Sequence, residues 1–329
     1  MEKNRIHWID MSKGICMMAI LLFHTEVYYN EKEIINYNLY VCNVLTIFFF
    51  LSGYHFYKVD VNNKKARYEL FFYRIKSILR KILMPYIIFT SIIAFPKALA
   101  HGDNTDFITL LTNILSGNAS WFIAALFVAE LFFSIALYIS NEKNTILYIS
   151  SILMFILSLY LSSLEKSISW QLDNACMAYT YLYLGYIYHK KENKLNFTYK
   201  YILILFIIIV LIKIYVLNEN VLMLIHPIKI TNIPVFIIDS LISIFIMINV
   251  CKWLPTVKLI EWTGAHSLVY YFFCGAVPLI VTTIMRKLGY IYEGYYFYVL
   301  IAFIIVYFVT TFVTWFIYKY LPFTTGKIK

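Results

Sequence analysis

Four ionisable side chains near the start of the chain lie in or beside an apolar stretch, RIHWIDMSKGICMMAILLFHTEVYY: Asp10, Lys13, His24 and Glu26. Ionisable groups within a membrane span are energetically expensive, and each is therefore a candidate for function. On a helix, the eleven-residue separation of Lys13 and His24 places both on one face, with His24 roughly 16 Å deeper. Imidazole titrates near neutral pH and can accept a proton from a hydroxyl, so His24 is a candidate general base.

Asp10 lies three residues before Lys13, on nearly the same stripe, and can pair with it. Two alternatives remain open for His24. His24 could instead hydrogen-bond a neighbouring helix, or lie at the outer membrane interface beside Glu26. Under the catalytic reading, Lys13 at the cytoplasmic side and His24 within the membrane face one cavity.

A basic run precedes Pro85, in the segment RIKSILRKILMPYI, and it offers a second kind of chemistry. Four cations lie within eight residues: Arg74, Lys76, Arg80 and Lys81. Guanidinium groups bind phosphate in bidentate fashion, so the run could hold a phosphorylated ligand. It could equally contact anionic lipid headgroups, each worth about 1 kcal/mol.

Three further polar residues fall inside apolar stretches. In FFFLSGY, Ser52 and its glycine neighbour allow a helix or a ligand to approach closely. Glu130 falls near mid-membrane in SWFIAALFVAELFF and needs a partner or a proton, for which His24, Lys213 or a polar cavity are the options. Asp239 is a similar residue without an evident partner.

The composition of the chain indicates that these residues lie in a membrane protein. The 329 residues are 61% hydrophobic and 14% charged, whereas soluble domains average about 45–50% apolar and about 25% charged. Segments that span a membrane must here be helical, because an open strand edge cannot satisfy its backbone hydrogen bonds in lipid. We therefore predict an all-α, polytopic membrane bundle in one domain, 1–329. Its ten predicted spans are 14–29, 37–57, 82–100, 120–140, 145–162, 171–188, 199–217, 233–251, 266–285 and 295–318.

The net charge of +10 is explained by topology and does not indicate nucleic-acid binding. Of the 28 Lys and Arg residues, 21 fall at the termini or in the even-numbered connections and 7 on the opposite side. The positive-inside rule therefore places both termini in the cytoplasm. We expect the basic segment 58–81 to extend the third span as a cytoplasmic helix, and the first stretch to remain as a span. The five cysteines have no metal-binding spacing and are expected to be buried thiols.

The order and spacing of these motifs resemble the acyltransferase 3 family of multi-spanning bacterial membrane proteins, and within it the fucose 4-O-acetylase-like group. The resemblance covers essentially the whole chain. Besides the segments already quoted, YLYLGYIYHK and EWTGAHSLVYY carry it. It implies a multi-pass protein of the bacterial inner membrane that moves acetyl from acetyl-CoA to a carbohydrate hydroxyl.

The resemblance also implies roles for individual residues. His24 matches the essential first-span histidine, and Asp10 matches the aspartate that precedes it. Lys13 stands where many relatives have arginine, which retains charge but loses the bidentate fork. Arg80, with Arg74 and Lys76, matches the basic motif ahead of the third-span proline. Two other departures are Thr46, where relatives often have proline, and Cys274, where many have a second histidine.

From these roles we predict a reaction and a site. His24 would act as general base, with Asp10 ordering the cavity mouth and Glu130 orienting the imidazole. The predicted donor-binding residues are Lys13, Ser52, Arg74, Lys76 and Arg80. Acetyl-CoA, a carbohydrate acceptor and membrane lipids are the expected partners, and neither metal nor nucleic acid is required. The alternative from another class is a transporter or flippase for an amphipathic substrate, which the lone Glu130 and Asp239 would suit.

Overall fold

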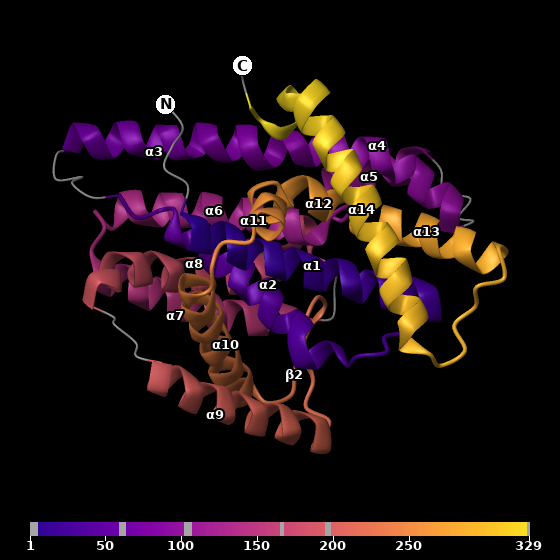
Figure 1. Ribbon diagram of the computed structural model, residues 1–329. Helices are drawn as coiled ribbons and strands as arrows, with labels where there is room; N and C mark the ends of the chain where they lie inside the picture. Colours follow the sequence, from indigo (N-terminus) through magenta and orange to yellow (C-terminus); the bar gives the residue numbers. More distant parts are fainter. Residues whose placement is uncertain (1–5, 59–63, 102–106, 165–167, 195–198, 328–329) are drawn as a thin grey trace.

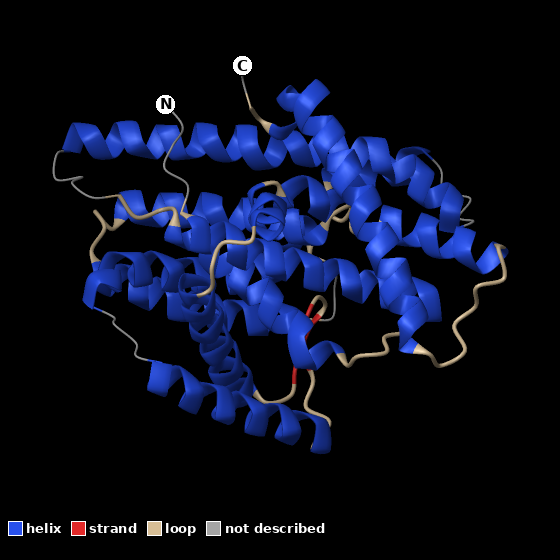
Figure 2. Ribbon diagram, in the orientation of Figure 1, coloured by secondary structure: helices blue, strands red, loops and turns tan. Residues whose placement is uncertain are grey.

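The computed structural model describes residues 6–58, 64–101, 107–164, 168–194 and 199–327. Nearly all of this is helix, with one short hairpin (Figure 2). The predicted all-α class is confirmed. The elements are α1 His7–Asn30, α2 Tyr37–Tyr54, α3 Lys64–Ile78, η1 Leu79–Leu83, α4 Met84–His101, α5 Phe107–Leu115, α6 Trp121–Ile139, α7 Asn144–Ser162, α8 Leu172–Lys191, α9 Tyr199–Asn218, β1 Met223–Ile225, β2 Ile228–Ile230, α10 Ile233–Trp253, α11 Lys258–Ala265, α12 Ser267–Phe273, α13 Ala276–Lys287, α14 Tyr296–Tyr320 and η4 Pro322–Thr325.

Each of the ten predicted apolar stretches is occupied by a helix or by one bent pair of helices. Within the described residues, seven helices are long and apolar enough to cross a membrane, and the pair α12–α13, bent by 47°, has the length and composition of a broken span or a re-entrant loop. The other two stretches form α1 and α8, which are more polar and contribute many buried residues to the interior. The bend in the ninth stretch was not predicted.

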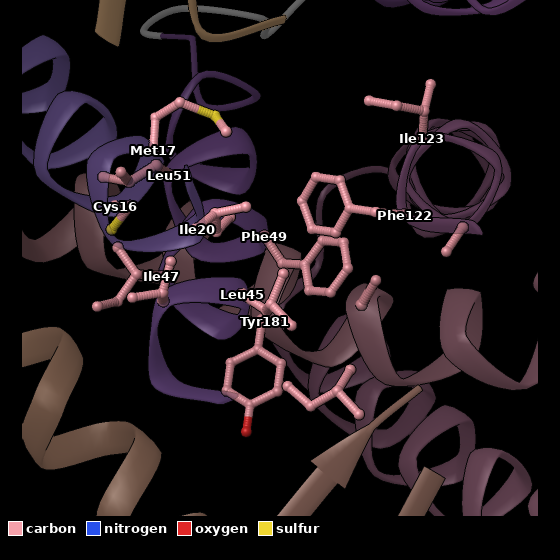
Figure 3. Packing of buried hydrophobic residues seen from close by; sticks show 14 of the residues in the cluster. Cys16, Met17, Ile20, Leu45, Ile47, Phe49, Leu51, Phe122, Ile123 and Tyr181 are labelled. Atoms are coloured by element: carbon pink, nitrogen blue, oxygen red, sulfur yellow. The ribbon is translucent and has the colours of Figure 1, made fainter. Parts of the chain in front are cut away.

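The centre of the bundle is built from α1, α2, α6 and α8. Figure 3 shows their apolar side chains meeting, with Phe49 of α2 beside Phe122 of α6. These two rings stack with centroids 4.7 Å apart. Glycine lets the helices approach closely: a Cβ on Gly185 of α8 would lie 2.0 Å from the carbonyl oxygen of Phe50 on α2. Small residues at such crossings allow backbone-to-backbone packing in membranes.

This crossing predicts a stability effect. Gly185→Ala should destabilise the protein by about 1–3 kcal/mol, because the added methyl must displace backbone. Gly275→Ala is the matched control, since a Cβ there would meet only the hydroxyl of Tyr28, at 3.7 Å. Thermal unfolding in detergent would measure both. Equal midpoints for the two variants would contradict the close crossing.

A buried ion pair fastens the outward-facing helix α9 to the bundle. Lys213 Nζ of α9 lies 2.8 Å from Asp239 Oδ2 of α10 and donates to Asn43 Oδ1 of α2 at 2.9 Å. Asn43 also donates to Asp239 Oδ2 at 2.7 Å. Asp239 is therefore not the lone carboxylate that the sequence suggested, and Lys213 pairs with it and not with Glu130.

The basic segment is helical over residues 64–81, as predicted, and its cytoplasmic placement stays a prediction. α3 continues through the π-helical turn η1 into α4, forming one helix across Lys65–Ala94 (Figure 1). Residues 59–63 of the predicted segment 58–81 lie outside the described residues. At the other end of the chain, Gly326 packs so tightly on the Arg80–Lys81 backbone that a Cβ would lie 2.4 Å from the Arg80 oxygen. The C-terminal segment thus lies on the same side as the basic run.

Candidate active site

A cavity of about 1240 Å³ opens between α3 and the bundle centre. One stripe of the α3–η1 helix forms a wall. Its lining residues recur every three or four positions, as one helical face requires. They are Leu70, Tyr73, Arg74, Ser77, Ile78, Lys81 and Ile82.

The residues of the other walls follow one another along the depth of the cavity. Connected by a short loop, α1 and α2 run in opposite directions, so the lining residues lead from Phe48 inside α2 to Lys58, which follows the end of α2. We name three zones. The mouth contains His55, Tyr57, Lys58, Tyr73 and Arg74; the middle contains Lys13, Ser52, Ser77, Lys81 and Glu130; and the deep end contains Phe48, Phe122, Ile123, Leu126 and Tyr271.

A polar cluster occupies the middle zone. The hydroxyl of Ser52 donates a short hydrogen bond to Glu130 Oε1. Lys13 lines the same zone from α1. The partner of Glu130 is thus Ser52 within a polar cavity, which was one of the options left open by the sequence. The cluster offers a cation, a hydroxyl and a carboxylate inside an otherwise apolar bundle.

The mouth is built around Arg74. Its Nη2 donates to the Phe56 carbonyl oxygen at 2.6 Å and lies 3.7 Å from Glu142 Oε1. The guanidinium also lies over the Phe56 ring, 5.7 Å from its centroid. Arg74 therefore lines the cavity and also ties α3 to the end of α2, with part of its charge offset by Glu142.

The predicted donor-binding residues divide into two groups. Lys13, Ser52 and Arg74 line the cavity, whereas the exposed Lys76 and the partly exposed Arg80 are not among its lining residues. Lys81 lines it instead and was missing from the predicted set. Its spacing of seven from Arg74, two helical turns, was the available signal.

His24 is not among the described residues that line the cavity. Its ring stacks on Tyr28 at 6.2 Å with an interplanar angle of 20°. The Tyr28 hydroxyl lies 3.7 Å from where a Cβ on Gly275 would stand, at the α12–α13 bend. Gly275 follows the deep-end residue Tyr271 by four positions, across the end of α12. The His24–Tyr28 pair thus lies beside the bend that follows the deep-end residue Tyr271.

Asp10 is fixed by a second close helix crossing. A Cβ on Gly264 of α11 would lie 1.7 Å from the Asp10 carbonyl oxygen. This contact holds the start of α1 firmly against α11, and Asp10 lines the cavity on the same side as Lys13. The predicted stripe of Asp10 and Lys13 therefore does face one cavity.

A family model described as an acyltransferase domain, acyltransferase 3, matches residues 6–319 of the chain. The chain belongs to the acyltransferase 3 family. No curated protein and no solved structure matches it. The protein is accordingly a membrane acyltransferase, as the motifs predicted, and it crosses the membrane several times.

In this acyltransferase 3 protein, two other histidines have structural partners. His189 lines the cavity, stacks on Tyr54 at 3.8 Å and shares a hydrogen bond of 2.7 Å with the Tyr54 carbonyl. His226, in the β1–β2 hairpin, stacks on Trp121 at 4.6 Å, and burial lowers its pKa. Over the described part of the chain, no three His, Cys, Asp or Glu side chains are grouped as a metal site would require.

Proposed function

We propose that this acyltransferase moves acetyl from acetyl-CoA to a hydroxyl of a cell-surface carbohydrate or its precursor, in the inner membrane of a bacterium. The supporting observation is the order of chemistry along one cavity. Cations line the mouth, cations and the polar cluster share the middle, and an apolar end approaches the His24–Tyr28 pair. A donor with phosphates at one end and a thioester at the other fits that order.

The donor would enter from the cytoplasmic side. Its phosphates would lie between Arg74 and Lys81, where charge-assisted hydrogen bonds are strongest. The pantetheine arm carries amide groups, which need hydrogen-bond partners inside the membrane. Ser52 and Ser77 supply hydroxyls along its path. The thioester would then lie at the deep end, near Tyr271.

The transfer itself would use His24 as general base. Its ring nitrogen takes the proton of the acceptor hydroxyl while the hydroxyl oxygen attacks the thioester carbonyl. The tetrahedral intermediate collapses, the carbon–sulfur bond breaks, and coenzyme A leaves as a thiolate that receives the proton from the imidazolium. Lys13, Asp10 and Glu130, the last held by Ser52, would order the polar part of the cavity, ahead of the apolar deep end that leads toward the imidazole.

The transporter alternative is less well supported. It drew on Glu130 and Asp239 as candidate proton carriers. Asp239 is fully buried and engaged with Lys213 and Asn43, away from the cavity lining. A structural ion pair explains it without transport. Glu130 remains, and it lies in the cavity that the acyl donor would occupy.

A donor-site prediction tests the proposal. Lys81→Ala should raise the KM for acetyl-CoA about 10- to 100-fold, because one charge-assisted phosphate contact is lost. Lys76→Ala is the matched control from the same basic run, since its exposed side chain is not among the lining residues. Coenzyme A release by protein in vesicles, with surface glycan as acceptor, would measure both. Absence of acetyl on the glycan in mass spectra would refute the proposed reaction.

A further inference from the structure

The cytoplasmic mouth carries aromatic rings that the proposed phosphate contacts leave unexplained. Tyr57 and Tyr73 both line it, from opposite walls. The Arg74 hydrogen bond to Phe56 joins these walls, and Tyr73 and Tyr57 are the sequence neighbours of the two joined residues. The two tyrosines are therefore attached next to the hydrogen bond that joins the two walls.

One of these rings is held rigidly. The Tyr57 ring lies nearly perpendicular to the rings of His189 and Tyr186, with centroids 5.2 Å and 5.7 Å away. His189 is fixed in turn by its parallel stack on Tyr54, with an interplanar angle of 1°. A ring held by two packed neighbours is preformed, because little side-chain entropy is lost when a planar ligand binds to it.

The opposite ring is available to a ligand. Tyr73 is 53% exposed although it lines the cavity. Along α3 it precedes Lys81 by eight residues, about 12 Å of helical rise. From the cytoplasm inward, a ligand would meet the two rings together with Lys58 and Arg74 at the mouth, and then Lys81 with the polar cluster in the middle zone.

We infer that this mouth binds the purine base of the acyl donor, stacked between Tyr57 and Tyr73, with Arg74 and Lys58 beside its sugar phosphates. The inference rests on the proposed function and deepens it: the site would recognise a nucleotide thioester and discriminate against the same acyl group on a bare pantetheine arm. Bases stack on aromatic side chains because every base has a π-face.

The test uses adenosine 3′,5′-bisphosphate, which carries the base and phosphates without the acyl arm. Calorimetry on the full-length protein in nanodiscs should show binding that Tyr73→Leu weakens about 5- to 150-fold. Tyr73→Phe, which keeps the ring, should bind as the wild type does. Tyr68→Leu is the matched control, since Tyr68 lies on the same helix with the same 53% exposure but is not among the lining residues.

Three results of the calorimetry would overturn the inference: no binding of the bisphosphate, equal binding by Tyr73→Leu and wild type, or binding of pyrophosphate as tight as that of the bisphosphate. Nanodiscs with and without anionic lipid test whether a lipid headgroup occupies the mouth instead of a nucleotide. Loss of bisphosphate binding only in the anionic discs would assign the mouth to lipid. Acetyl transfer that does not depend on the ring would reject the purine site and leave the proposed function standing. Bisphosphate binding without any transfer would reject the function and leave the purine site.

Discussion

His24→Ala should lower the rate of acetyl transfer about 10²- to 10⁴-fold, the usual contribution of a general base. The KM for acetyl-CoA should stay close to that of the wild type, because His24 is not among the residues lining the donor cavity. A loss in kcat without a change in KM indicates an interaction made only in the transition state. Steady-state release of coenzyme A in the presence of acceptor would supply both constants.

The control for this variant is another stacked histidine. His226 packs on Trp121 much as His24 packs on Tyr28, but it belongs to the β1–β2 hairpin. His226→Ala should therefore retain transfer. If His24→Ala kept more than about a tenth of the wild-type rate, its imidazole would not be the base.

Lys213→Met should cost about 3–5 kcal/mol of stability, because it strands the carboxylate of Asp239 in the bundle interior. Asp239 is 0% exposed, and the amide of Asn43 would remain as its hydrogen-bond donor among the described side chains. The double variant Lys213→Met/Asp239→Leu should recover most of the loss, because replacing both members of a buried pair by apolar groups is often neutral.

The reactivity of the cysteines on heating measures the stability of these variants. Cys16, Cys42, Cys176, Cys251 and Cys274 are all free and buried, so a thiol-reactive dye reports their exposure on heating. Lys200→Met on the same helix, where the side chain is exposed, should leave the midpoint unchanged. An unshifted midpoint for Lys213→Met would show that the pair does not stabilise α9.

The sequence predicted the helices well, because length and hydropathy are local properties. It also predicted that Asp10 and Lys13 share a face, since helical spacing fixes that arrangement. Contacts between distant segments were not predictable. The Ser52–Glu130 bond joins positions 78 residues apart, and the Asn43–Asp239 contact joins positions 196 apart. Such pairings depend on which helices become neighbours.

The basic run shows the same limit within a single helix. Its four cations were evident, but the side of the helix that faces the cavity is set by packing against α6 and the end of α2. Lys81 therefore lines the cavity while Lys76 points elsewhere. The predicted involvement of Lys76 and Arg80 in donor binding remains a prediction that these positions do not support directly.

The unbroken helix α1 has a consequence for substrate choice. It carries Lys13 in the cavity and His24 beside the bend, with its start packed closely against Gly264 of α11. The spacing between these two groups is set by hydrogen-bonded backbone and cannot stretch. Under the proposed function, α1 would therefore fix the distance between donor and base, and acceptors of different size would have to be accommodated by the bent α12–α13 pair that packs against it.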